Sequence, residues 1–102
     1  MIRHVVFFSA TNPEDISAIF DGLSILADIP HALLFEVRRN LKVDKINGKD
    51  PDFIVYAEFA DQEALDAYKA HPLYEKSISI VRPLRDIRIA ADFFTKDIAF
   101  LV

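Results

Sequence analysis

The chain has 102 residues, a formal net charge of -4 and no cysteine. This length suits one domain, which we expect to span residues 1–102 with a core of about 1–94 and a C-terminal tail of 95–102. Because the net charge is negative, the protein has no positive electrostatic field that would attract nucleic acid. The lack of cysteine excludes disulfides, thiolate nucleophiles and cysteine-based zinc sites. Since no apolar run is long enough for a membrane span or a signal-peptide core, we expect a cytoplasmic protein with no membrane partner.

The first half of the sequence predicts a strand, a helix and a second strand. Residues 2–9 are rich in β-branched and aromatic side chains. Asn12 then supplies a helix cap, with Pro13 at the first helical position. The helix expected from Pro13 to about Ala27 has apolar residues at helical spacing, namely Ile16, Ile19, Phe20, Leu23 and Leu26. Pro30 ends it, and residues 32–43 then alternate apolar and polar side chains with the period of a strand.

The second half repeats this order after a polar connection at residues 44–52. Residues 53–60 predict a third strand, and Asp61 opens a second helix that extends to about Ala70. Pro72 interrupts this helix, residues 73–81 predict another helical segment, and residues 84–94 predict a fourth strand. The order β-α-β, loop, β-α-α-β indicates an α+β fold of the ferredoxin-like, split β-α-β type, with a four-stranded, mostly antiparallel sheet and helices on one face.

The strand residues predict a partner for the other face of this sheet. Helices cover one face, yet Val5 and Phe7 alternate with Val6 and Phe8, and the fourth strand gathers Ile87, Ile89, Ala91 and Phe93 on one side. A second copy pairing face to face would bury this surface, so we expect a homodimer. The alternative is a monomer whose own tail, with Ile98, Phe100 and Leu101, covers the face.

His4 is the candidate catalytic residue, because imidazole titrates near neutral pH and lies here on the strand face toward the helices. The fourth strand should run antiparallel beside the first, which brings Asp92 near His4. A carboxylate there would fix the imidazole tautomer and raise its basicity. The alternatives are a buried neutral imidazole satisfied by hydrogen bonds and an ordinary cross-strand polar pair.

Gly22 interrupts the first helix and indicates a cavity between helix and sheet, where an apolar or aromatic small molecule would bind. The residues expected around this cavity are Phe8, Ile19, Leu26, Val55 and Phe59. Close packing of the helix on the sheet is the alternative reason for the glycine. The three histidines lack metal-ligand spacing, and no glycine-rich loop or nucleophile motif is present, so we expect no metal and no cofactor.

Several segments resemble, in their order and spacing, the stress-responsive A/B barrel domain proteins. They are Met1-Ile2-Arg3-His4-Val5-Val6, Tyr56-Ala57-Glu58-Phe59, Ala64-Leu65-Asp66-Ala67-Tyr68, Ala70-His71-Pro72 and Asp92-Phe93. The similarity spans nearly the whole chain and implies a dimeric α/β barrel. It implies no single activity, because the family includes stress-related proteins without known reactions as well as polyketide cyclases.

The resemblance also implies pocket residues beyond His4. In the cyclases of this family a strand-one histidine, a tyrosine at the position of Tyr68 and the second histidine of a His-Pro-x-His motif line the pocket. This sequence reads His71-Pro72-Leu73-Tyr74, so Tyr74 replaces that second histidine, and a tyrosine near neutral pH is an acid or donor and a poor base. We therefore place His4, Tyr68, Asp92 and Tyr74 in the catalytic set and His71 with the binding residues.

Two functions remain open from the sequence. The first is a dimeric protein that binds an apolar or aromatic small molecule and performs cofactor-free acid-base chemistry on it. The second is a non-enzymatic, stress-associated protein that acts through self-assembly.

Overall fold

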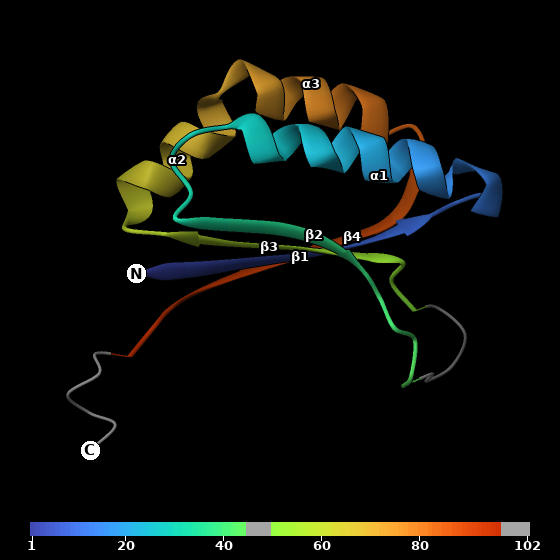
Figure 1. Cartoon of the computed structure of the whole chain (residues 1–102), viewed down its shortest axis with the longest axis horizontal. Coiled ribbons are helices and arrows are strands. Elements are labelled where there is room, and N and C mark those ends of the chain that lie inside the picture. The colour runs from blue at the N-terminus through green and yellow to red at the C-terminus, as the bar shows by residue number, and fades with distance from the viewer. Residues whose placement is uncertain (45–49, 97–102) are drawn as a thin grey trace.

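The computed structural model describes residues 1–44 and 50–96, which form a sheet with all of their helices on one face (Figure 1). The strands are β1 (Ile2–Ala10), β2 (Leu34–Arg39), β3 (Phe53–Phe59) and β4 (Arg85–Phe94). The helices are α1 (Ile16–Ser24), α2 (Gln62–Ala70) and α3 (Pro72–Val81), with the 3-10 turns η1 (Pro13–Asp15) and η2 (Ile25–Asp28) at the two ends of α1. The strand order is β2-β3-β1-β4 and every neighbouring pair is antiparallel, which is the predicted ferredoxin-like arrangement.

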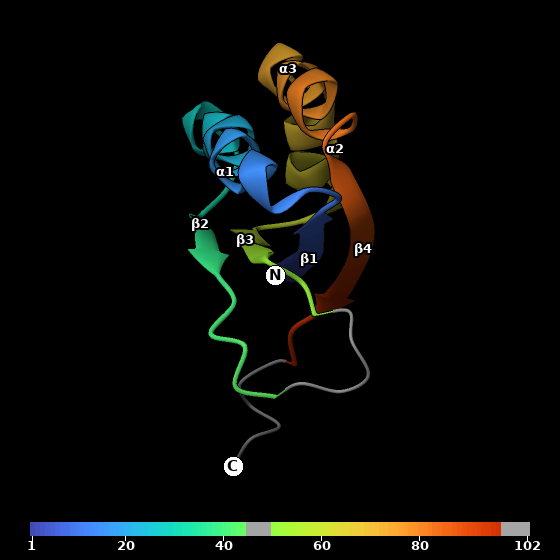
Figure 2. The same cartoon turned by 90° about the vertical axis from the view of Figure 1, so that its right-hand side faces the viewer.

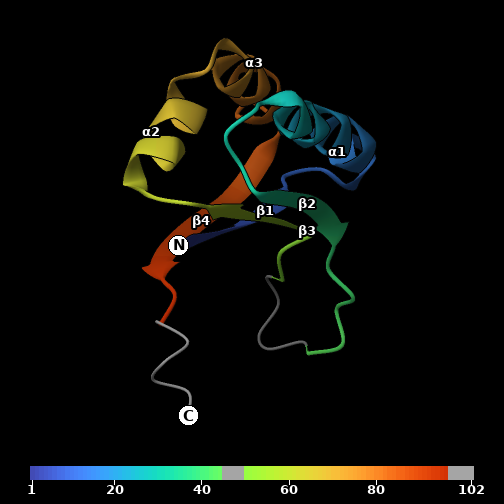
Figure 3. The same cartoon turned by 60° about the vertical axis from the view of Figure 1, so that its left-hand side comes forward.

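The helices form a single layer above the sheet. Figures 2 and 3 show α1 on the side of β2 and α3 on the side of β4, with the two helices next to each other. The face of the sheet beneath them supplies much of the core, including Ile2, Val6, Phe53, Val55, Ala57 and Phe59. Ile19, Leu23 and Leu26 pack down from the first helical segment, as their spacing predicts.

The helix ends follow the sequence signals closely. Pro13 occupies the first helical position after Asn12, although the Asn12 side chain makes no capping hydrogen bond. The Asp61 side chain caps α2 by accepting a hydrogen bond from the Ala64 N–H at 2.9 Å. His71 ends α2 and caps α3, because its Nδ1 accepts a hydrogen bond from the Leu73 N–H at 3.1 Å. The predicted break at Pro72 is therefore a change of direction between two helices.

The second strand is shorter than the predicted range of 32–43. β2 pairs with β3 only from Leu34 to Arg39, and Leu41 and Val43 are 85% and 79% exposed. The reason lies at Asn40, whose side chain accepts from the Lys42 N–H at 2.9 Å and donates to the Pro51 carbonyl at 2.8 Å. Lys42 adopts a φ of 57°, so the chain turns out of the sheet although the alternation of side chains continues.

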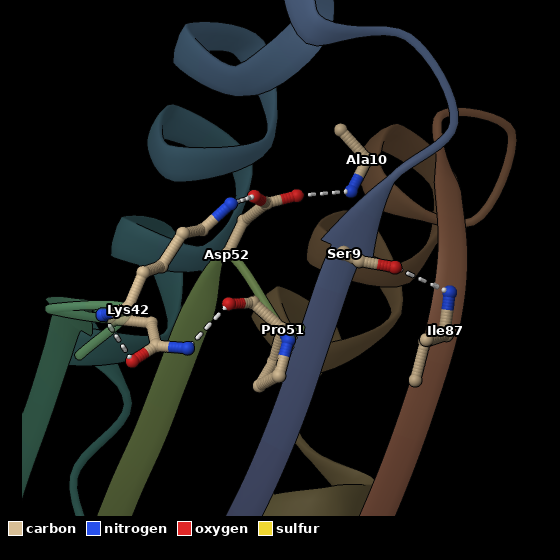
Figure 4. Close-up of polar contacts among 7 residues, drawn as sticks. Ser9, Ala10, Lys42, Pro51, Asp52 and Ile87 are labelled. Carbon is tan, nitrogen blue, oxygen red and sulfur yellow. Dashed lines mark hydrogen bonds and ion pairs between the residues drawn. The ribbon is translucent and has the colours of Figure 1, made fainter. Parts of the chain in front are cut away.

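Asp52 ties this turn to the end of β1 (Figure 4). Its carboxylate accepts from the Ala10 N–H at 2.8 Å and from the Lys42 ammonium at 2.6 Å. Burial opposes the charged form, but the hydrogen bonds from Lys42 and Ala10 and the charge of Lys42 together hold the pKa of Asp52 below its ordinary value. Asp52 therefore links the turn after β2 to the end of β1 through a partly buried ion pair.

Among the described residues no helix lies on the second face of the sheet, and large apolar side chains are exposed there. Phe7, Ile89 and Phe93 are 36%, 59% and 49% exposed. The tail residues proposed as an alternative cover, and the centre of the polar connection, lie outside the described residues. No helix within the described ranges is both long enough and apolar enough to cross a bilayer.

Candidate functional site

A cavity of about 260 Å³ lies between the helices and the sheet. Its apolar wall includes Val6, Phe8, Leu23, Leu26, Val55 and Val81. Its polar side chains include His4, Tyr68, Tyr74, Arg82, Arg85 and Arg88. A cavity is therefore present between helices and sheet, and Phe8, Leu26 and Val55 line it as expected.

His4 is buried in the floor of this cavity and is held by Asp92. The two residues are paired directly across the β1 and β4 ladder, and His4 Nδ1 hydrogen-bonds to Asp92 Oδ1. The predicted geometry is thus confirmed. Asp92 is partly exposed and does not line the cavity, so its carboxylate acts on the ring of His4 from outside. Because Nδ1 is engaged, Nε2 is the ring nitrogen left for a ligand.

Two tyrosines stand over this histidine. The Tyr68 ring makes edge contacts with the His4 ring, centroid to centroid 6.1 Å, and with the Tyr74 ring at 5.3 Å. Burial, with a smaller effect of Tyr74, raises the pKa of Tyr68, and the positive charge of Arg88 only partly opposes this. The Tyr68 hydroxyl therefore keeps its proton at neutral pH and is suited to donate a hydrogen bond.

Four residues predicted to bind a ligand do not line the cavity. Ile19 is fully buried in the core, and Phe59 packs behind the tyrosines with its ring centroid 5.0 Å from that of Tyr68. His71 is occupied as a helix cap, with its Nδ1 on the Leu73 N–H. Gly22 faces α3, where an added Cβ would lie 2.8 Å from Val81 Cγ2. The glycine thus serves close packing between two helices, and the cavity lies beneath them.

Three arginines at one end of the cavity, Arg82, Arg85 and Arg88, were not predicted from the sequence. Phe8 pairs with Arg88 and Ala10 pairs with Arg85, so a bulge in β4 places three steps of β4 against two steps of β1. The Ile87 N–H at this bulge donates to Ser9 Oγ at 2.9 Å (Figure 4). A regular strand would send residues three apart to opposite faces, but the bulge lets Arg85 and Arg88 reach the same cavity. Only the register of the sheet reveals this.

Within residues 1–44 and 50–96, no three histidine, aspartate or glutamate side chains come together in a way that could hold a metal ion. The polar side chains that line the cavity carry an imidazole, two phenols, three guanidinium groups and the hydroxyl of Ser77.

A family model described as the stress responsive A/B barrel domain matches residues 2–95. The chain belongs to this family. No curated protein matches it. Among solved structures, a family protein from Mesorhizobium loti with a ferredoxin-like fold is 26% identical, with a TM-score of 0.76 and coverage of 94% of this chain and 97% of that one. A dimeric ferredoxin-like protein of unknown function from Thermobifida fusca is also 26% identical, with a TM-score of 0.74 and coverage of 90% and 88%.

The stress responsive A/B barrel domain also shares its fold with more distant proteins. SnoaB from Streptomyces nogalater, described as a cofactor-independent oxygenase, is 17% identical over 94% of this chain and 93% of that one, with a TM-score of 0.68. Because the sequence identity is only 17%, the similarity to SnoaB concerns the fold alone. The Tyr74 hydroxyl accepts a hydrogen bond from Arg88 Nη2 at 3.4 Å.

Proposed function

We propose that this protein binds an apolar or aromatic small molecule in the cavity between helices and sheet and moves a proton on it without a cofactor. The observation that carries the proposal is the buried imidazole of His4, which lines the cavity and is oriented by Asp92. A cavity with an apolar wall and a few convergent polar groups is the usual form of a small-molecule site.

The proposed proton transfer follows from the roles of Asp92 and Tyr68 beside His4. Asp92 accepts a hydrogen bond from the Nδ1–H of His4, so the lone pair of Nε2 is available to take a proton from a carbon acid next to a carbonyl group. The electrons left on the ligand move to an adjacent carbonyl oxygen, which becomes an enolate. The Tyr68 hydroxyl, kept protonated by burial, is suited to donate a hydrogen bond to that oxygen.

Deuterium exchange into a simple carbon acid tests this proposal without knowledge of the natural substrate. We expect the wild-type protein to accelerate exchange at the central carbon of benzoylacetone in D₂O above the buffer rate. His4→Gln should abolish the acceleration, and Asp92→Asn should reduce it about tenfold or more, because the tautomer is no longer fixed. Lys69→Gln, on the exposed side of α2, is the matched control. Equal rates for wild type and His4→Gln would disprove the catalytic part.

We further propose that the protein acts as a homodimer in which a second copy covers the open face of the sheet. The exposed side chains of Phe7, Ile89 and Phe93 support this, since contiguous apolar surface of this kind usually marks an interface. The description of the Thermobifida fusca protein as dimeric also supports it.

The same open face favours the second candidate, a protein that acts through self-assembly alone. A thermal-shift screen with aromatic and polyketide-like compounds separates the two functions, because a ligand that binds only the folded state raises its stability. If no compound shifts the transition at millimolar concentration and no exchange is catalysed, self-assembly is the better account.

A further inference from the structure

Three arginines converge on the end of the cavity that lies away from His4. Arg85 and Arg88 reach it from β4 because of the bulge opposite Ser9, and Arg82 reaches it from the end of α3. These are half of the arginines in the chain. Arg88 Nη2 also donates a hydrogen bond to the Tyr74 hydroxyl at 3.4 Å.

No carboxylate balances these charges within the cavity lining of the described residues. The ion pairs between residues in the ranges 1–44 and 50–96 join other side chains: Arg3 with Glu58, His4 with Asp92, Arg38 with Glu36, and Lys42 with Asp52. The whole chain has a net charge of -4, so the cavity is a local cationic region in an acidic protein. A concave site of one sign focuses its field on a ligand of the opposite sign.

We propose that the ligand of this cavity carries one anionic group, held by Arg82, Arg85 and Arg88, on an apolar body that lies along Leu23, Leu26 and Val55. This inference rests on the proposed function and names its substrate class. A carboxylate and a phosphate monoester both offer the oxygen geometry that guanidinium groups bind in pairs. The chemistry shared by the two is an oxyanion on an apolar molecule.

The register of the sheet separates the anionic end from the reactive end. His4 and Phe8 are four residues apart on β1, a distance of about 13 Å along a strand, and Arg88 lies beside Phe8. The anionic group therefore anchors the ligand, and a different part of the molecule reaches His4 Nε2. The arginines are positioning residues for the reaction, whereas His4 acts on the reacting atom.

Matched two-ring probes test the inference by isothermal titration calorimetry: 2-naphthoate, 2-naphthyl phosphate and the neutral 2-naphthamide. We expect at least one of the two anions to bind tenfold or more tightly than the amide, with an affinity that falls as NaCl is raised. In the variant Arg85→Gln/Arg88→Gln this preference should fall to less than threefold, while the affinity for the amide stays within twofold. Arg39→Gln, at the far edge of the sheet, should leave all three affinities unchanged.

The outcomes separate this inference from the proposed function. If all three probes bind equally, or if the double variant keeps the preference, the cavity binds small molecules but the anionic class is wrong. If no probe binds at millimolar concentration, both proposals fail. A preference for the phosphate over the carboxylate identifies the headgroup and supports the inference, as does the reverse preference.

Discussion

Ser77 Oγ on α3 donates a hydrogen bond of 2.8 Å to the backbone carbonyl of Gly22 on α1. The contact is buried, and Gly22 has no side chain that would keep the two helices apart at this point. Ser77 also lines the cavity beneath the two helices. Gly22 therefore contributes to stability, and it influences ligand binding only through the positions of α1 and α3.

Gly22→Ala should destabilise the protein by about 1–2 kcal/mol, despite a gain of up to about 1 kcal/mol in helix propensity. The new Cβ would lie 2.8 Å from Val81 Cγ2 and 2.9 Å from Ile80 Cγ2, and both neighbours are β-branched and stiff. Urea unfolding measures the change, with Asp21→Ala at an exposed position of α1 as control. A stabilised Gly22→Ala would show that the two helices can move apart freely.

The raised pKa of Tyr68 predicts a loss of stability at alkaline pH. Because the folded chain holds this proton to higher pH than the unfolded chain, the contribution is complete below about pH 10 and is lost as the pH rises above it. Above pH 10 the free energy of unfolding should fall more steeply for wild type than for Tyr68→Phe, by up to about 1.4 kcal/mol per pH unit. The raised pKa of Tyr56, due first to its hydrogen bond with Glu58, is common to both proteins and cancels in the comparison. Parallel curves from urea unfolding between pH 8 and 11 would contradict this assignment.

Asp52 predicts a loss of stability in acid. Its pKa is lowered in the folded protein, so its contribution is present above the ordinary carboxyl pKa of about 4 and is lost as the pH falls through the folded value. Asp52→Asn should lower the free energy of unfolding by about 1–3 kcal/mol at pH 7, because buried hydrogen bonds to charged groups are lost. The difference from wild type should shrink below about pH 4. The exposed Asp28→Asn serves as control, and a difference that stays constant with pH would count against the role of the Asp52 charge.

Light scattering should give about twice the chain mass of 11.6 kDa, since the open face of the sheet is apolar. Ile89→Asp should produce a monomer or prevent folding, because it places a charge among the apolar side chains of that face. Circular dichroism distinguishes these two results. Ala27→Asp, an exposed position on the helical side, should remain dimeric. A stable wild-type monomer at micromolar concentration would overturn the homodimer.

The sequence by itself determined the order of the elements and much of the site. Apolar periodicity and prolines marked the helices and strands, because these signals act over a few neighbouring residues. The same local pattern misled at residues 40–43, where the side chains continue to alternate but the hydrogen bonds of Asn40 turn the chain away from the sheet. The pairing of His4 with Asp92 was predicted because antiparallel neighbours set the start of β1 against the end of β4.

Only the tertiary structure decided what Gly22 faces and which residues close the cavity. Gly22 was expected to open a cavity, yet its empty side is used by α3, a contact between segments more than fifty residues apart. The arginine end depends on one extra residue in β4 opposite Ser9, and no local signal at Arg85 or Arg88 indicates a bulge. The physical reason is that a bulge reverses the alternation of side chains beyond it, so the face a residue occupies is set by its partner strand and not by its own sequence.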